Sequence, residues 1–147
     1  MTAVGRQTGL IPVRIVDGRI EILLVTSLDT GRWVIPKGNV GPRLTPALAA
    51  IREGYEEAGV MGTLLSDNPV GSYEYLKRLA NGRITQMTVD VFPFLVERQH
   101  RKWPEKKKRR LKWFRAADAA ILVDEPGLSE LLLSAEDELV KKAAGLE

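Results

Sequence analysis

Three glutamates near the end of one helical segment are the residues whose types and spacing most favour chemistry. Glu53, Glu56 and Glu57 lie just before Gly59, and glycine commonly ends a helix. Carboxylates there face the negative end of the helix dipole, and acids three or four positions apart repel each other. An exposed acidic surface is one interpretation. The other is a site for a hard cation such as Mg²⁺ or Mn²⁺, because carboxylate oxygens bind such ions and the ion removes the repulsion.

The segment that carries these glutamates has start and stop signals for a helix over residues 46–58. Thr45 suits the N-cap, Pro46 suits the first turn, and Gly59 suits the position after the last turn. Advancing 100° per residue places the glutamates on the outward side. The predicted core-facing side comprises Ala47, Leu48, Ile51, Tyr55 and Ala58.

A basic segment follows later in the chain, at residues 98–112 (RQHRKWPEKKKRRLK). It holds nine Lys or Arg and one acid, Glu105, and its net charge is +8, whereas the rest of the chain carries −5. A local positive patch of this kind favours an anionic partner. A solvated loop explains the same pattern equally well.

The composition excludes several classes of chemistry. The chain has no cysteine and one histidine, His100, which excludes disulfides, thiol nucleophiles, cysteine-rich zinc sites and any triad that needs another histidine. Its 147 residues predict one domain, 1–147. No apolar run is long enough to cross a membrane, and the first residues lack the pattern of a signal peptide, so we expect a cytoplasmic location.

The remaining pattern predicts a mixed α/β domain, because strands surround one helix and further helices follow them. A short extended piece is expected at 32–36, and turns are expected at 17–19 and 80–83. Strands are predicted at 10–16, 20–27, 69–77, 84–97 and 111–114. Helices after the last strand are predicted at 116–122 and roughly 127–143.

Read from its first glycine, the stretch GNVGPRLTPALAAIREGYEEAGV resembles the Nudix box, G-x5-E-x7-R-E-U-x-E-E-x-G-U, in which U is a bulky aliphatic residue. Two positions depart from the box: Leu44 replaces its first glutamate, and Gly54 replaces an aliphatic residue. Gly54 suggests close packing against a neighbouring strand, since glycine inside a helix costs about 1 kcal/mol relative to alanine. The matching positions are Gly38, Arg52, Glu53, Glu56, Glu57, Gly59 and Val60.

The resemblance implies the Nudix fold, a mixed β-sheet sandwiched between α-helices with a catalytic loop-helix-loop at about 36–60. It also implies Mg²⁺- or Mn²⁺-dependent hydrolysis of a diphosphate (pyrophosphate) bond. Gly38 would let the loop backbone approach the metal, and Arg52 would orient the glutamates through ion pairing. The metal ligands carried over from the box are Glu53, Glu56 and Glu57. The general base is open among Glu53, Glu74 and Glu105, and for the last two a plain surface glutamate is the favoured interpretation.

Beyond the box, the stretches EEAGVMGTL, KWPE and LKWF resemble the diphosphoinositol polyphosphate phosphohydrolases, and PKG resembles the dinucleoside tetraphosphate hydrolases. Both resemblances imply a small, highly anionic polyphosphate substrate. Candidate residues for its phosphates are Ser27, Arg32, Lys37, Lys106, Lys107 and Arg109, together with Lys108 and Arg110. Candidates for stacking on a nucleobase are Trp33, Tyr73, Tyr75 and Trp103, although core packing explains Trp33, Trp113 and Phe114 better.

Two alternatives remain open at this point. One is an RNA 5′-pyrophosphohydrolase that uses the basic segment on the RNA backbone, although no platform of spaced aromatic residues is evident. The other is a non-catalytic Nudix-like module that binds polyphosphate, in which Leu44 marks loss of the catalytic site. The sequence does not indicate the oligomeric state.

Overall fold

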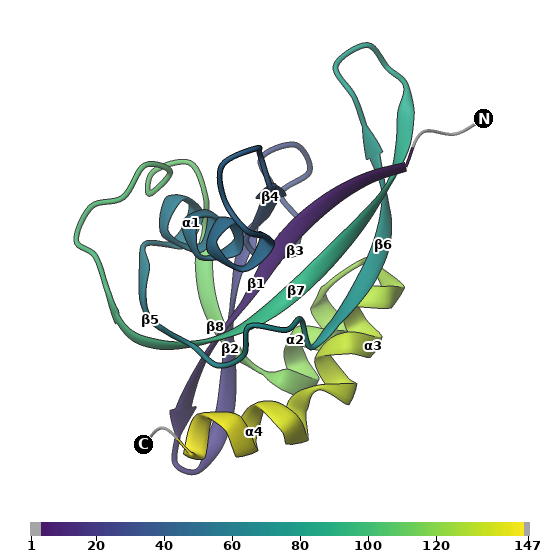
Figure 1. Cartoon of the computed structure of the whole chain (residues 1–147). Coiled ribbons are helices and arrows are strands. Elements are labelled where there is room, and N and C mark those ends of the chain that lie inside the picture. Colours follow the sequence, from purple (N-terminus) through teal and green to yellow (C-terminus); the bar gives the residue numbers. More distant parts are fainter. Residues whose placement is uncertain (1–3, 146–147) are drawn as a thin grey trace.

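The computed structural model describes residues 4–145 and arranges their strands in one eight-stranded mixed sheet (Figure 1). The main order is β3-β2-β1-β7-β5, with β4 beside β1, β6 beside β7 and β8 beside β2. The strands are β1 (Val4–Val16), β2 (Arg19–Thr26), β3 (Trp33–Val34), β4 (Lys37–Asn39), β5 (Val60–Leu64), β6 (Gly71–Arg78), β7 (Ile84–Gln99) and β8 (Leu111–Arg115). The helices are α1 (Pro46–Ala58), α2 (Ala116–Leu122), α3 (Pro126–Ser134) and α4 (Glu136–Ala144).

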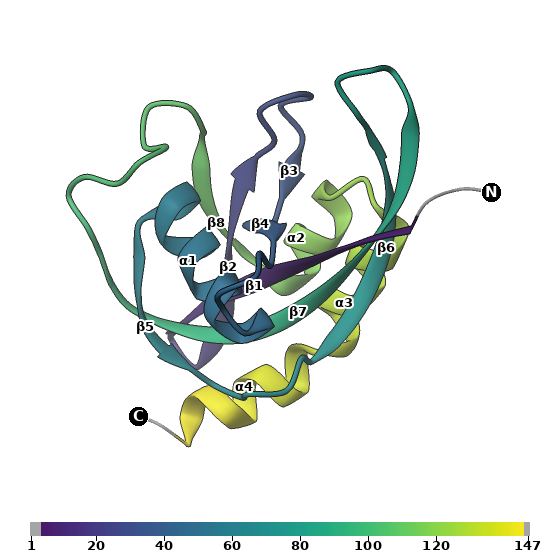
Figure 2. The same ribbon diagram turned by 45° about the horizontal axis from the view of Figure 1, so that its top comes forward.

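Helices cover both faces of this sheet, as predicted. Helix α1 lies on one face, and α2, α3 and α4 lie on the other (Figure 1 and Figure 2). Two apolar cores result, one on each face. The α1 side includes Leu10, Leu23, Val25, Phe92 and Phe94. The opposite side includes Ile11, Val13, Ile22, Leu24, Leu128, Leu132 and Leu139.

The central pair of strands is longer than predicted. Strand β1 begins at Val4 rather than residue 10, because its first half pairs in parallel with β7 from Val4↔Gln86 onward. The predicted turn after β1 is confirmed: Asp17 and Gly18 adopt positive φ angles of 52° and 74°, which suit a two-residue hairpin turn. The long β1–β7 pair therefore forms the frame to which the other elements attach.

The predicted core-facing side of α1 is correct only in part. Ala58 is buried, and Ala47 and Ile51 pack against the core on this face of the sheet. Leu48 and Tyr55 are 51% and 38% exposed, whereas Ala50, Gly54 and Ala58 are buried. These small residues recur every four positions and let the helix lie very close to the sheet. A Cβ atom on Gly54 would lie 2.5 Å from Leu10 Cδ2, so the predicted close packing of this glycine against a strand is confirmed.

Three further elements differ from the sequence prediction. Strands β4 and β5 were not predicted, because both are short and gain their structure from pairing with β1 and β7. The single helix predicted at 127–143 is two helices, with Ala135 at the junction between α3 and α4. Among residues 4–145, no helix is long and apolar enough to cross a membrane.

Candidate functional site

The ends of α1 are fixed by the residues that the sequence singled out. Thr45 Oγ1 accepts a hydrogen bond from the Leu48 amide at 3.3 Å, and Gly59 ends the helix with a φ of 68°. Thr8 of β1 donates its hydroxyl to the Pro46 carbonyl at 2.6 Å, which ties the first turn to the sheet. The last two turns of α1, which carry the glutamates, are therefore held in a defined position.

The three glutamates differ in environment. Glu57 is only 3% exposed, so it does not lie on an outward acidic surface as the helical pattern predicted. Glu56 is partly exposed and pairs with Arg52, with 3.8 Å between Glu56 Oε1 and Arg52 Nε. Glu53 is partly buried and lies against Gly38 of β4, where a Cβ atom would come within 2.1 Å of Glu53 Oε1. Only glycine fits at position 38 with this arrangement.

The loop between β7 and β8 brings two of its charged residues to these glutamates, and it passes beside α1 in Figure 1. Arg109 lies 2.8 Å from Glu105 and 3.7 Å from Glu57, and it donates to the Thr26 carbonyl at 2.9 Å. The Glu105 amide donates to the Glu56 carbonyl at 2.9 Å, which fastens the loop to the helix. Glu105 thus lies at the glutamate cluster.

The same loop is anchored at the end of α1 by an aromatic ring. Trp103 lies directly against Gly59, where a Cβ atom would be 2.3 Å from the indole Cε3 atom. Next to it, the His100 amide donates to the Gly59 carbonyl at 2.8 Å. Trp103 therefore has a packing role at the helix end.

Electrostatics in the cluster disfavour the ionised forms of two of the glutamates. Burial raises the pKa of Glu57 to about 8; Arg109 opposes part of this rise, and Glu53 adds to it. Burial and the neighbouring Glu56 raise the pKa of Glu53 to about 7. Both carboxylates are thus unfavourable as anions without further positive charge nearby.

The donor set fits a hard divalent ion, although the side chains are not closed around one. Within residues 4–145, no three acidic or histidine side chains converge on a single point as a ready-made metal site. Arg109 lies instead between Glu57 and Glu105. All the available ligands are carboxylate oxygens, the type that Mg²⁺ and Mn²⁺ prefer.

Lys37, whose charge interacts with Glu57, belongs to a second group of polar residues. Burial lowers the pKa of Lys37, while Glu57 and then Glu125 act in the opposite direction. The Lys37 ammonium lies 4.8 Å from the centre of the Tyr75 ring. The Tyr75 hydroxyl donates to Gln7 Oε1 at 2.6 Å. Gln7 and Glu125 were not predicted, because their proximity depends on pairing between distant segments and no local motif marks them.

Several predicted residues lie apart from the cluster. Arg32, in the loop after β2, pairs with Asp124 at 2.9 Å, and its carbonyl accepts a hydrogen bond from the Ser27 amide at 2.8 Å. Ser27 itself follows Thr26, whose carbonyl binds Arg109. Glu74 accepts a hydrogen bond from Gln86 at 2.7 Å on the β6–β7 hairpin and is not among the charges that act on Glu53 or Glu57.

The lysines of the β7–β8 loop face a separate surface hollow of about 430 Å³. Its lining contains none of the glutamates. Lys106 donates to the Arg101 carbonyl and lies 5.1 Å from the Trp103 ring centre. The lining residues are Lys102, Trp103, Pro104, Lys106, Lys107 and Lys108.

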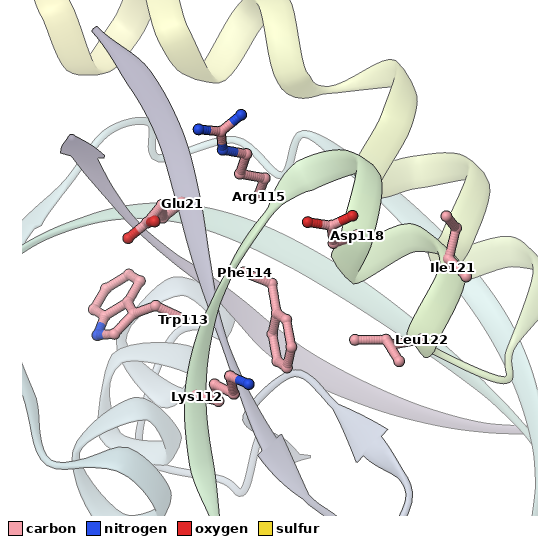
Figure 3. A pocket seen from close by; sticks show the side chains of 8 residues that line it. All are labelled: Glu21, Lys112, Trp113, Phe114, Arg115, Asp118, Ile121 and Leu122. Atoms are coloured by element: carbon pink, nitrogen blue, oxygen red, sulfur yellow. The ribbon is translucent and has the colours of Figure 1, made fainter. Parts of the chain in front are cut away.

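A larger hollow of about 530 Å³ lies over β8 and α2, also away from the glutamates. Figure 3 shows Trp113 and Phe114 on opposite sides of β8 beside this hollow. Phe114 packs edge-on against Trp33 at 5.3 Å, which agrees with the predicted core role of both rings. Glu21 at the rim is paired with Arg14 at 2.6 Å. Nothing in this lining resembles the glutamate cluster.

Comparison with known proteins gives a consistent assignment. A family model described as the NUDIX domain matches residues 6–134. Nudix hydrolase 21, chloroplastic, from Arabidopsis thaliana is 34% identical over 117 residues, which cover 78% of this chain and 56% of that protein. The human diphosphoinositol polyphosphate phosphohydrolase 3-alpha is 51% identical over 45 residues, which cover 30% of this chain and 27% of that protein. The matches to three Nudix hydrolases from Arabidopsis thaliana span only 54% to 62% of the length of those proteins.

Solved structures agree on the architecture. A binary complex of the C. elegans Ap4A hydrolase has a TM-score of 0.69 at 26% identity, covering 93% of this chain and 98% of that one. The E. coli dihydroneopterin triphosphate pyrophosphohydrolase has a TM-score of 0.68 at 19% identity, covering 90% and 95%. The second likeness is evidence of fold alone. Together they confirm the predicted fold.

Proposed function

Because the chain belongs to the Nudix family, we propose that it hydrolyses a diphosphate bond with Mg²⁺ or Mn²⁺ as cofactor. The observation that carries this proposal is the packing of Glu57 and Glu53. Burial and neighbouring carboxylates raise the pKa values of both, so their ionised forms need a nearby cation to be stable. When bound, the ion supplies positive charge that offsets the charge of the diphosphate and of its leaving oxygen.

The residues of α1 have distinct proposed roles. Glu53, Glu56 and Glu57 would hold the metal. Arg52 would orient Glu56, with which it is paired at 3.8 Å, and Gly38 leaves the space that Glu53 occupies. Because Leu44 replaces the first glutamate of the box, all the proposed metal ligands come from the last two turns of α1.

The general base is proposed to be Glu105 or Glu53. Support for Glu105 is its place at the cluster, where Arg109 holds its carboxylate at 2.8 Å and its amide binds α1. Support for Glu53 is its raised pKa of about 7, which is suited to accepting a proton near neutral pH. Glu74 receives no such support, because its carboxylate is engaged by Gln86 on the hairpin.

The proposed substrate is a small, highly anionic polyphosphate, such as a diphosphoinositol polyphosphate or a diadenosine polyphosphate. The printed names of two similar proteins, a diphosphoinositol polyphosphate phosphohydrolase and an Ap4A hydrolase, support this class. Arg109, which lies 3.7 Å from Glu57, and Lys37, whose charge interacts with Glu57, would contact the diphosphate. More distant phosphates would be met by Ser27, Arg32, Lys106 and Lys107. A cytoplasmic location remains a prediction.

The test is hydrolysis of a substrate panel with Mg²⁺, with Mn²⁺ and with a chelator. The panel contains diadenosine polyphosphates, a diphosphoinositol polyphosphate, nucleoside triphosphates and 5′-triphosphate RNA. We expect metal-dependent turnover by the wild type, at least a hundredfold loss in Glu56→Gln, and no loss in the control Glu136→Gln on α4. Binding without turnover by the wild type would favour the polyphosphate-binding module, and a preference for RNA would favour the 5′-pyrophosphohydrolase.

A further inference from the structure

Strand β8 has one open edge. It pairs with β2 along its whole length, from Leu111↔Val25 to Arg115↔Glu21. Among residues 4–145 it pairs with no other strand. The second edge of β8 therefore carries backbone groups that no other strand satisfies, and such an edge is a template for pairing with another chain.

The register shows which backbone groups point to this open edge. The Thr26 amide donates to the Arg110 carbonyl at 3.1 Å, which makes these two residues a hydrogen-bonded pair. Hydrogen-bonded and non-hydrogen-bonded pairs alternate along an antiparallel ladder, so the backbone groups of Lys112 and Phe114 bond to β2 as well. The residues whose amides and carbonyls point away from β2 are therefore Leu111, Trp113 and Arg115.

The hollow of about 530 Å³ over β8 and α2 opens onto this edge. Its lining contains Trp113 from one side of β8 and Phe114 from the other, so it lies in front of the strand rather than over one face of the sheet (Figure 3). On the Phe114 side, α2 borders the hollow with Ile121 and Leu122, which are 81% and 40% exposed. Another chain paired with β8 would run beside these two apolar side chains.

The charged residues of the hollow are balanced in sign. They are two cations and two carboxylates: Lys112, Arg115, Glu21 and Asp118. Within residues 4–145, none of Lys112, Arg115 and Asp118 forms an ion pair. A patch of this kind suits a second copy of itself, because a twofold interface brings each residue against a different residue of the same patch. A strongly acidic or strongly basic partner would meet like charge here as well as opposite charge.

Antiparallel pairing of two β8 strands matches these charges. Trp113 is the middle residue of β8, so full overlap puts it opposite its own copy, and its outward backbone groups form a hydrogen-bonded pair. The start of each β8 then lies beside the end of the other, where α2 begins. The Lys112 ammonium lies 5.5 Å from the Phe114 ring centre, on the α2 side of the strand. It can therefore reach Asp118, in the first turn of the other copy's α2.

We propose that this face is the interface of a symmetric dimer, in which two β8 strands pair in antiparallel and Lys112 of each copy faces Asp118 of the other. The two sheets then continue into one. Ile121 and Leu122 supply the apolar part of the contact, as is usual at the centre of a homodimer interface. The glutamate cluster is not part of this face, so the dimer is independent of the proposed function.

Sedimentation equilibrium over a concentration series, with light scattering as a second measure of mass, tests the dimer. We expect the wild type to dimerise. Lys112→Asp and Asp118→Lys should each raise the dissociation constant of the dimer at least tenfold, because each variant places like charges together twice in every dimer. An equimolar mixture of the two variants should dimerise again, because every such contact then joins opposite charges.

Circular dichroism and thermal unfolding establish that each variant is folded. A wild type that stays a monomer at every concentration overturns the proposal. It is also overturned if the mixture dissociates as readily as the single variants, because recovery requires that position 112 of one copy faces position 118 of the other.

The backbone pairing has its own test at Arg115. Its φ of −64° suits proline and its amide does not bond to β2, so Arg115→Pro should leave the monomer folded. The proline removes one outward N–H from each copy. It should therefore weaken the dimer about tenfold relative to Arg115→Ala, which keeps the amide. Equal dissociation constants for the two variants would overturn the pairing of β8 strands.

The apolar part of the interface is tested at Ile121. Ile121→Ser should weaken the dimer severalfold, because this side chain is 81% exposed in the monomer and lines the hollow. The matched control is Leu133→Ser on α3, which is 54% exposed and outside the lining, and it should leave the dissociation constant unchanged. An effect of Leu133→Ser with none of Ile121→Ser would place the interface on another face and overturn the proposal.

Discussion

Arg109 and Glu57 face each other across the candidate active site, with 3.7 Å between Arg109 Nη1 and Glu57 Oε1. Their side chains are 11% and 5% exposed, and they come from segments far apart in the sequence. Arg109 also binds Glu105 and the Thr26 carbonyl. One guanidinium therefore joins helix α1, the β7–β8 loop and strand β2.

This contact predicts a stability cost for removing the guanidinium. Measured above about pH 8, where Glu57 is ionised, Arg109→Met should lower the free energy of unfolding of the metal-free protein by about 3 kcal/mol, because it leaves the Glu57 and Glu105 carboxylates unpaired. Urea unfolding with a chelator measures the effect, and Arg101→Met, at an exposed position of the same loop, is the control. Equal changes in the free energy of unfolding for the two variants would show that the contacts of Arg109 with Glu57 and Glu105 do not stabilise the fold.

A second prediction concerns the space beside β4. Gly38→Ala should reduce kcat at least tenfold, because the new Cβ atom would displace the Glu53 carboxylate. Circular dichroism should show that the fold is retained. Gly145→Ala is the matched control, since its Cβ would meet its nearest neighbour at an ordinary 3.5 Å. Unchanged activity of Gly38→Ala would mean that Glu53 acts from another position.

The pKa values of the glutamates predict how pH affects the metal-free protein. In the folded state the pKa values of Glu57 and Glu53 are about 8 and about 7, above the usual 4.5 of a glutamate. Between pH 4.5 and about 8 the folded state therefore binds more protons than the unfolded state. This contribution to stability is complete below pH 4.5 and is lost as the pH rises through about 8. Stability with a chelator should therefore fall across this range, and less steeply in Glu57→Gln.

Metal addition should reverse this trend. Mg²⁺ binds the ionised carboxylates, so the stability that it adds should grow as the pH rises. Urea unfolding at about pH 6 and about pH 8, with Mg²⁺ and with chelator, measures both effects. The same stability increment at both pH values would indicate that the metal binds elsewhere.

Close packing of α1 on the sheet gives a fourth prediction. Gly54→Val should destabilise the fold by about 2 kcal/mol, because its side chain would overlap Leu10. Leu10→Ala opens space at that point, so the double variant should be more stable than the sum of the single effects by at least about 0.5 kcal/mol. Strict additivity in urea unfolding would contradict direct contact.

Local sequence was sufficient wherever one short segment determines the structure. Thr45, Pro46 and Gly59 defined α1 because capping depends on adjacent residues. The helical pattern identified Ala58 on the buried face but wrongly added the large apolar residues Leu48 and Tyr55. It missed Ala50 and Gly54, whose close contact with the sheet depends on the strand that they approach.

Residues whose role depends on distant partners were harder to identify. The basic segment was one candidate for phosphate contacts, yet Arg109 turns inward to the glutamates while Lys106 and Lys107 line another hollow. Gln7 gave no signal, because its hydrogen bond with Tyr75 depends on strands β1 and β6, which both pair with β7. Composition reveals the charge of a segment but not the direction of its side chains.

The packing of Trp103 on Gly59 provides a built-in optical probe. The chain has three tryptophans, and the other two, Trp33 and Trp113, pack against the sheet cores. Replacing those two with phenylalanine would leave one tryptophan at the junction of the β7–β8 loop and helix α1. Stopped-flow emission from that single indole would report, in real time, whether the loop leaves α1 during a catalytic cycle.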